Sequence, residues 1–113
     1  MNNERKYGLL ELDIERIISI FEANPKIDNV ILFGSRAIGT YKPGSDIDIV
    51  LKGTDVKLID ILNFNAELDK LSLPYKFDII IYDRITENAL IEHIKRVGIS
   101  LFERKKPSAQ QKI

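Results

Sequence analysis

The sequence Gly34-Ser35-Arg36-Ala37-Ile38-Gly39, followed by Ser45-Asp46-Ile47-Asp48-Ile49, combines a turn of small residues with two aspartates. The turn comes directly after the apolar run at residues 30–33, and the aspartates introduce a second apolar run. A turn of small residues suits phosphate, because the backbone can approach the phosphate oxygens closely. Paired carboxylates suit a divalent metal. Together the two features indicate chemistry on a metal-bound nucleoside triphosphate.

Asp46 and Asp48 alternate with the apolar residues Ile47, Ile49 and Leu51. In a strand, side chains alternate between two faces, so the carboxylates point to one side and the apolar side chains to a core on the other. The two Cβ atoms then lie roughly 6.6 Å apart along the strand. Two carboxylates about 5 Å apart repel by roughly 3 kcal/mol at an effective dielectric constant near 20. Bound Mg²⁺ would relieve this repulsion.

A third acidic residue, Asp78, stands in the strand-like run at residues 77–81. An ionised group is costly to bury alone, so such an acid is paired, metal-bound or at the exposed end of its strand. If this strand lies beside the one that carries Asp46, the third carboxylate joins the other two. Each feature alone also has an ordinary explanation, because Gly-Ser is common in turns and a single Asp-x-Asp is a weak signal. Their order, spacing and strand context together favour the metal site.

In this order, Gly-Ser, Asp-x-Asp and a distal Asp resemble the DNA polymerase β-like nucleotidyltransferase superfamily. More narrowly, Gly-Ser-Arg-Ala-x-Gly-x5-Ser-Asp-Ile-Asp resembles the minimal nucleotidyltransferase (MNT) proteins of bacteria and archaea. The resemblance runs from the first helix through Phe102 and includes residues 73–78 and 92–98. One position departs from the pattern, which often has a basic residue where this chain has Ile38.

The resemblance implies a role for each carboxylate. Asp46 and Asp48 would hold the metal on the β- and γ-phosphates and share a second metal with Asp78. Two Mg²⁺ ions and ATP are therefore the implied cofactors and donor. The second metal would lower the pKa of an acceptor hydroxyl, whose oxygen attacks the α-phosphorus and expels pyrophosphate, with Asp78 helping to take the proton.

The resemblance also implies that the turn binds phosphate. Gly34 would let the backbone approach the triphosphate, and Ser35 would bind the terminal phosphates through its amide and hydroxyl. Arg36 would neutralise charge on the phosphate oxygens. Ser45 belongs to the same group of residues and would orient the loop or an aspartate.

The apolar pattern predicts a small α/β domain. Helices are predicted over about residues 9–23, 36–39 and 86–97, and around the apolar positions between 58 and 68. Strands are predicted over residues 30–33, 46–51 and 76–82. Residues 100–102 are a candidate for a short fourth strand. Ser35, Thr54 or Asp55, and Thr86 are the predicted helix N-caps. The second and third strands form a βαβ unit and are parallel, whereas the first must run antiparallel so that Gly34 and Asp46 meet. We therefore expect a mixed sheet with packed helices, the minimal nucleotidyltransferase fold.

Composition limits the classes of function. The 113 residues suit one domain, which we place at residues 1–103, followed by a mobile polar tail at 104–113. Seventeen basic and seventeen acidic residues argue against direct nucleic-acid binding. The chain has no cysteine and no apolar run long enough to span a membrane, so a cytoplasmic location without membrane contact is expected.

The chain leaves little room for an acceptor-binding domain, so acceptor recognition must come from a partner. The MNT resemblance implies a helical HEPN-domain protein, often a ribonuclease toxin, which the MNT antitoxin inactivates by moving AMP from ATP onto a tyrosine. Three alternatives stay open. They are a catalytic subunit that modifies a small molecule, a nucleotide-binding antitoxin that acts by complex formation alone, and a structural subunit with vestigial metal sites.

Several other residues attract attention. His93, the only histidine, is interpreted as a residue of a helix surface rather than a ligand. Tyr41 lies near the phosphate turn and either stacks on a base or packs on its own domain. Leu9, Leu12 and Ile20 are candidates for a second apolar face of the first helix used in assembly, although a wide apolar arc more often belongs to the core.

Overall fold

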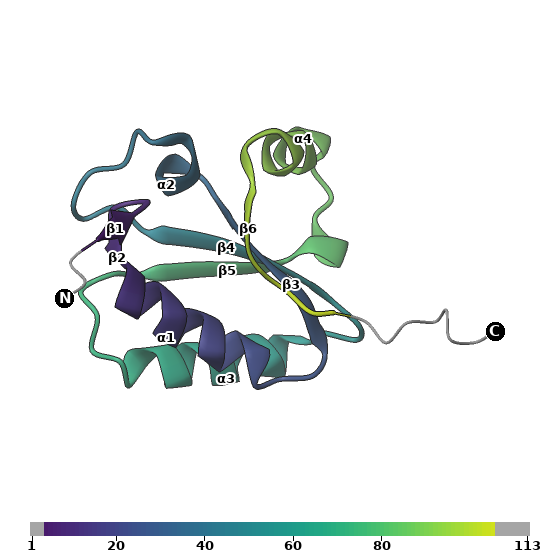
Figure 1. Cartoon of the computed structure of the whole chain (residues 1–113). Helices are drawn as coiled ribbons and strands as arrows, with labels where there is room; N and C mark the ends of the chain where they lie inside the picture. Colours follow the sequence, from purple (N-terminus) through teal and green to yellow (C-terminus); the bar gives the residue numbers. More distant parts are fainter. Residues whose placement is uncertain (1–3, 106–113) are drawn as a thin grey trace.

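The computed structural model describes residues 4–105, and its centre is a four-stranded sheet in the order β5-β4-β3-β6 (Figure 1). The strands of this sheet are β3 (Ile27–Phe33), β4 (Ile47–Gly53), β5 (Phe77–Ile81) and β6 (Ile99–Glu103). Helices α1 (Glu11–Glu22) and α3 (Leu58–Asp69) cover one face, and α4 (Asn88–Val97) covers the other. The short helix α2 (Ser35–Ile38) follows β3, and a 3-10 turn, η1 (Tyr82–Arg84), follows β5.

The predicted strand directions are confirmed. Strands β4 and β5 are parallel and joined by α3, whereas β3 pairs with β4 and with β6 in antiparallel fashion. The connection from β3 to β4 therefore lies at the same end of the sheet as the start of β5. The candidate fourth strand at residues 100–102 is also confirmed, and it is longer than predicted.

Two apolar cores occupy the two faces of the sheet. The larger core, on the side of α1 and α3, includes Ile47, Ile49 and Leu51 of β4, each with no exposed surface. The smaller core, on the side of α4, joins Val50 to residues of β3 and to Ile94. Since side chains alternate along a strand, Asp46 and Asp48 share the face of Val50. The prediction that the apolar residues of this strand face a core opposite the two carboxylates is confirmed.

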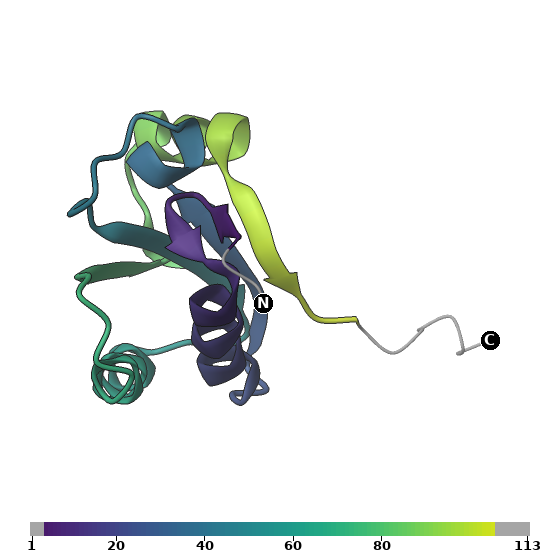
Figure 2. The ribbon, with the colours of Figure 1, turned by 60° about the vertical axis from the view of Figure 1, so that its left-hand side comes forward.

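An N-terminal hairpin was not predicted. Strands β1 (Arg5–Lys6) and β2 (Leu9–Leu10) pair through Tyr7 and Gly8, which have φ angles of 59° and 78°. Two successive residues with positive φ are the geometry that joins tight hairpins. The hairpin lies between α1 and α2 in both views (Figures 1 and 2). It delays the start of α1 to Glu11, where the helical spacing had predicted residue 9.

The hairpin also changes the interpretation of the first helix as an assembly face. Leu9 lies in the hairpin with 2% of its surface exposed, so its prediction as an exposed apolar residue is wrong. Ile20 is partly buried against the larger core. Leu12, which is 52% exposed, remains on the outer side of α1.

The N-cap predictions were wrong by one to a few residues. The N-cap of α2 is Gly34, that of α3 is Lys57 and that of α4 is Glu87. At α3 the capping interaction comes from inside the helix, because the Asp60 carboxylate accepts a hydrogen bond from the Lys57 backbone N–H at 2.8 Å.

Most of the predicted polar tail at residues 104–113 lies outside the described residues. Its first residue, Arg104, is tied to the domain, because its guanidinium donates to the carbonyls of Ile27 and Glu22 at 2.9 Å and of Asn24 at 3.2 Å. Ordered contacts thus extend one residue beyond the predicted boundary. Among residues 4–105 no helix has the length and apolar character needed to cross a bilayer.

Candidate active site

Gly34 places the predicted phosphate-binding turn, residues 34–39, against β4, the strand that carries Asp48. It sits between β3 and α2 with φ of 77°, a value that favours glycine. A Cβ atom built at Gly34 would collide with the Asp48 carboxylate oxygen Oδ2. The turn and the Asp48 side chain are therefore in direct contact, and this contact leaves no room for a side chain at residue 34.

The three predicted carboxylates lie at one end of two neighbouring strands. Asp48 in β4 is the direct register partner of Asp78 in β5, and Asp46 immediately precedes β4. Adjacent strands lie about 4.8 Å apart, so Asp48 and Asp78 are neighbours on the face covered by α4. Asp46 and Asp78 are exposed, whereas Asp48 is partly buried.

The electrostatics of Asp48 reflect this grouping. Burial raises the pKa of Asp48 above its ordinary value of 3.8, and the negative charges of Asp78 and Asp46 raise it further; His93 and Arg36 act in the opposite direction. Within residues 4–105 none of the three carboxylates forms an ion pair or a hydrogen bond with another side chain. The site thus concentrates negative charge that no described side chain balances through an ion pair.

This arrangement fits a magnesium site that needs a further partner. Among residues 4–105 no three His, Cys, Asp or Glu side chains are gathered into a ready-made metal site. Mg²⁺ does not need such a cage, because it binds through one or two carboxylates together with substrate phosphates and water. A divalent cation stabilises the ionised form of carboxylates that have no ion pair, including a carboxylate with a raised pKa such as that of Asp48. The residues present therefore fit Mg²⁺ bound together with a triphosphate.

Arg36 is placed differently from its predicted role. Its side chain is 1% exposed, and Nη1 donates to the Tyr7 carbonyl at 2.9 Å. Nη2 and Nε donate to the Ser45 carbonyl at 2.8 and 3.2 Å. The guanidinium also lies over the rings of Tyr41 and Tyr75, 5.3 and 4.9 Å from their centroids. Its donors are used by backbone carbonyls, so Arg36 holds the loop before β4, and its predicted contact with phosphate stays a prediction.

The two serines have separate surroundings. The Ser45 hydroxyl accepts from the Lys42 backbone N–H at 2.8 Å and so shapes the loop, whereas its role of orienting the site stays a prediction. The Ser35 carbonyl accepts from the amides of Gly39 and Thr40 at 2.8 and 3.0 Å and closes α2. The Ser35 hydroxyl has no hydrogen-bond partner within residues 4–105. It remains available to a ligand, and its phosphate contact stays a prediction.

His93 is the residue that sequence reasoning undervalued. Its ring packs edge-on against Phe33, with centroids 6.1 Å apart and planes at 81°, and it lowers the pKa of Asp48. Phe33 is the register partner of Asp48 in β3. His93 therefore faces the carboxylate side of the sheet from α4. Because His93 directly precedes the apolar Ile94, the sequence could have predicted that His93 lies beside the sheet. It could not have predicted that His93 lies near Asp48.

Tyr41 follows the second of its two interpretations. Its ring covers Arg36, and a Cβ atom at Gly8 would meet the Tyr41 ring and the Arg36 guanidinium. Tyr41 thus packs on its own domain and joins the N-terminal hairpin to the phosphate turn.

Comparison with known proteins agrees with this geometry. The sequence family described as "Polymerase beta, Nucleotidyltransferase" matches residues 15–107. The chain belongs to this nucleotidyltransferase family. It is 33% identical over 82 residues to a protein of Methanocaldococcus jannaschii described as "Putative protein adenylyltransferase MJ0141", covering 67% of this chain and 80% of that protein. The resemblance to the minimal nucleotidyltransferases is confirmed, and the chain is a nucleotidyltransferase.

Solved structures extend the comparison. A toxin–antitoxin crystal structure with AMP-PNP superposes with a TM-score of 0.68 at 26% identity, covering 81% of this chain and 74% of that one. A tri-AMPylated HEPN toxin of Shewanella oneidensis in complex with its MNT antitoxin gives a TM-score of 0.62 at 22% identity, covering 90% and 75%. The second likeness shows the fold alone. The predicted minimal nucleotidyltransferase fold is confirmed.

Proposed function

We propose that this chain moves AMP from Mg²⁺-bound ATP onto a tyrosine hydroxyl of a partner HEPN-domain toxin and thereby acts as its antitoxin. The contact between Gly34 and the Asp48 carboxylate carries the proposal, because it joins a phosphate-binding turn to the carboxylates in one site. The protein adenylyltransferase description of the archaeal relative supports a protein acceptor. The AMP-PNP in the similar toxin–antitoxin complex supports an adenine nucleotide donor and a toxin partner.

The residues divide the work as follows. Asp46, Asp48 and Asp78 would hold two Mg²⁺ ions, which supply charge neutralisation on the triphosphate and a lowered pKa for the acceptor hydroxyl. Gly34 admits the triphosphate to the backbone, and the Ser35 hydroxyl donates to a terminal phosphate oxygen. Arg36 and Ser45 keep the loop that carries Asp46 in place. In this division of roles Arg36 supports the site indirectly, because its guanidinium donates to the backbone carbonyls of Tyr7 and Ser45.

In the proposed transfer, one bond forms and one bond breaks at the α-phosphorus. The acceptor oxygen forms a bond to this phosphorus, the bond to the oxygen that bridges the α- and β-phosphates breaks, and pyrophosphate leaves with that oxygen. Asp78 is exposed at the start of an edge strand and takes the hydroxyl proton. Asp78 is suited to this step because it lies beside Asp48 while remaining open to an incoming acceptor.

The test is the intact mass of a HEPN-type protein encoded next to this chain, after incubation with this chain, ATP and Mg²⁺. A mass gain of one or more AMP groups is expected with the native chain and with Asp83→Asn, an exposed acid outside the site. No gain is expected with Asp46→Asn/Asp48→Asn. A stable complex without any mass gain would contradict the proposal and favour neutralisation by binding or a small-molecule acceptor.

A further inference from the structure

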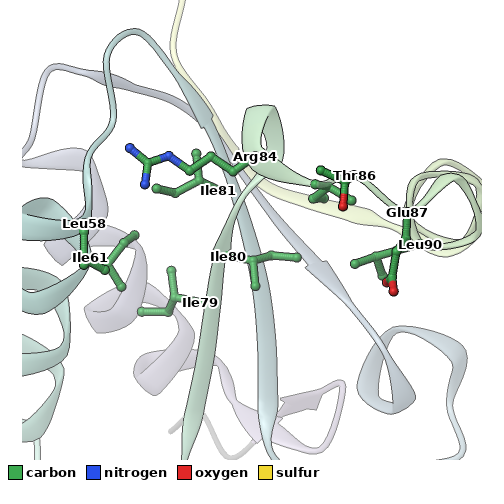
Figure 3. Close-up of a pocket in the computed structure, with 10 residues that line it drawn as sticks. Leu58, Ile61, Ile79, Ile80, Ile81, Arg84, Thr86, Glu87 and Leu90 are labelled. Carbon is green, nitrogen blue, oxygen red and sulfur yellow. The ribbon is translucent and has the colours of Figure 1, made fainter.

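A cavity of about 400 Å³ runs along the outer edge of β5 (Figure 3). It is bounded by α3 through Leu58 and Ile61, by the strand itself through Ile79 to Ile81, and by the region around η1 and the start of α4. Its lining is almost entirely aliphatic, and two charged residues, Arg84 and Glu87, stand at its rim.

The cavity touches both faces of β5. Ile79 and Ile81 belong to the core on the side of α1 and α3, whereas Ile80 packs with Leu90 in the core on the side of α4. An occupant must therefore present apolar side chains to two opposite sides of the sheet. An added β-strand does this by its alternation, whereas a helix lying on one face of the sheet does not.

The backbone of β5 is also open to such an occupant. β5 is the terminal strand of the sheet, and the Lys76 carbonyl accepts from the Ile47 backbone N–H at 2.9 Å. Backbone groups alternate in direction along a strand, so those of Phe77, Ile79 and Ile81 point away from β4. Within residues 4–105 no strand pairs with these donors and acceptors, which lie along the aliphatic cavity and form an edge of the kind that native proteins normally protect.

The apolar surface continues onto the outer side of α3. Leu58, Ile59 and Leu62 are 62%, 57% and 56% exposed, and Leu58 also lines the cavity. Large exposed aliphatic residues gathered beside an open strand edge are typical of an interaction surface.

Charge and position indicate what kind of segment fits. Arg84 is exposed and has no ion pair within residues 4–105, so one end of the edge offers a cation for a carboxylate. The other end carries Asp78, which lies roughly 10 Å from Ile81 along the strand. A segment paired with Ile79 and Ile81 therefore passes directly beside the candidate catalytic carboxylate.

We propose that the outer edge of β5 receives an extended aliphatic segment of the acceptor protein as an added strand. A carboxylate of this segment pairs with Arg84, and its acceptor hydroxyl lies at the Asp78 end. The inference rests on the proposed function. It adds that the acceptor hydroxyl belongs to an extended segment of the partner and not to a folded surface.

Binding is tested without nucleotide, so that its result is independent of AMP transfer. The probes are two short peptides of alternating valine and threonine, one with an N-terminal tyrosine and a C-terminal glutamate, the other with these two residues exchanged. One order suits a parallel added strand and the other an antiparallel one. We expect one peptide to shift the NMR amide signals of Phe77, Ile79 and Ile81 and to slow their hydrogen exchange.

Two substitutions sharpen the test. Ile79→Pro removes an outward N–H without removing a hydrogen bond to β4, and loss of this bond should weaken peptide binding about tenfold or more. Its fold is checked by thermal unfolding. Arg84→Gln should weaken binding of the peptide that carries glutamate, but not of the same peptide with glutamine in place of that glutamate. Arg96 is an exposed arginine on α4, and Arg96→Gln should change the binding of neither peptide.

The outcomes decide the inference. Peptide-induced shifts at β5 that depend on Arg84 would support it even if no AMP transfer were ever detected. No shift at millimolar peptide would overturn it, as would tighter binding of a helical peptide. Concentration-dependent broadening of the β5 signals without peptide would also overturn it, because a second copy of this chain would then occupy the edge.

Discussion

The α-carbon of Gly34 lies against the carboxylate of Asp48, close enough that any side chain at residue 34 would collide with it. The predicted phosphate-binding turn and the Asp48 carboxylate are therefore packed together, so that a change in one displaces the other. This contact gives the first prediction a built-in control. Gly39 also has a positive φ, 101°, but a Cβ atom added there would meet no atom within 4 Å.

Gly34→Ala should lower the free energy of unfolding by more than about 1 kcal/mol and abolish Mg²⁺–ATP binding. Gly39→Ala should cost comparable backbone strain but keep nucleotide binding, because only residue 34 touches Asp48. Denaturant unfolding and titration calorimetry measure the two effects. Equal loss of binding in both variants would mean that strain, and not the contact with Asp48, is responsible.

Asp48 makes stability depend on pH. Its folded pKa is raised above 3.8 by burial and by Asp78 and Asp46, so the folded state holds a proton that the unfolded state has already released. Stability should therefore fall as pH rises from about 3.8 through the raised pKa. Asp48→Asn should remove this fall and be more stable than the native chain at neutral pH. Unfolding at a series of pH values, without Mg²⁺, measures the difference, which should vanish at low pH.

Arg36→Met should destabilise the domain by about 1–3 kcal/mol, because the carbonyls of Tyr7 and Ser45 lose their donors. If Arg36 acts by holding the loop, Mg²⁺–ATP affinity should fall together with stability. Arg36→Lys keeps the charge but cannot reach both carbonyls, so it should resemble the methionine variant. Retained affinity in the lysine variant alone would instead indicate that charge at the phosphates matters.

Asp78→Asn should separate binding from transfer. Asp78 is assigned to the acceptor side, so Mg²⁺–ATP binding should stay near native while AMP transfer falls at least about 100-fold. Asp46→Asn should lose binding itself. Calorimetry and intact mass of the acceptor protein provide the two measurements. Loss of nucleotide binding in Asp78→Asn would contradict this division of roles.

The part-buried pair of Lys26 and Asp60 should govern acid stability on the far side of the domain. The two side chains meet at 2.7 Å, and hydrogen bonds from Lys26 and from the Lys57 backbone lower the pKa of Asp60 below 3.8. The contribution is present above about pH 3.8 and is lost as pH falls through the lowered pKa. Lys26→Met should therefore be destabilised most at neutral pH. Lys57→Met, which breaks an exposed pair at 3.8 Å with Asp55, should have little effect at any pH.

The sequence predicted what depends on alternation and order. The shared face of Asp46 and Asp48 follows from period-two patterning. The parallel pairing of β4 and β5 follows from the βαβ connection, and the antiparallel direction of β3 follows from the need for Gly34 and Asp46 to meet. The N-terminal hairpin was missed because its strands have two residues each, too short for a periodic signal. The burial of Arg36 was not predicted, because it depends on that hairpin, on Tyr41 and on Tyr75, which come together only in the fold.

The position of His93 shows a second limit. Helical spacing places it beside the apolar stripe of α4, but the stripe does not say over which strand residues the helix crosses. Only the packing of His93 against Phe33, the partner of Asp48 in β3, brings the imidazole to the carboxylates. Long-range packing of this kind cannot be obtained from one sequence.

The parallel pairing of β4 with β5 predicts that the site assembles in an early and a late step during folding. Asp48 lies in the antiparallel pair of β3 and β4, Gly34 directly follows β3 and Asp46 directly precedes β4, so the contacts among these residues are local along the chain. Asp78 arrives only after α3 has carried the chain back across the sheet, and such non-local pairing forms more slowly. If the three carboxylates act as proposed, a newly made chain would bind nucleotide before it could transfer AMP, because Asp78 would join the site last.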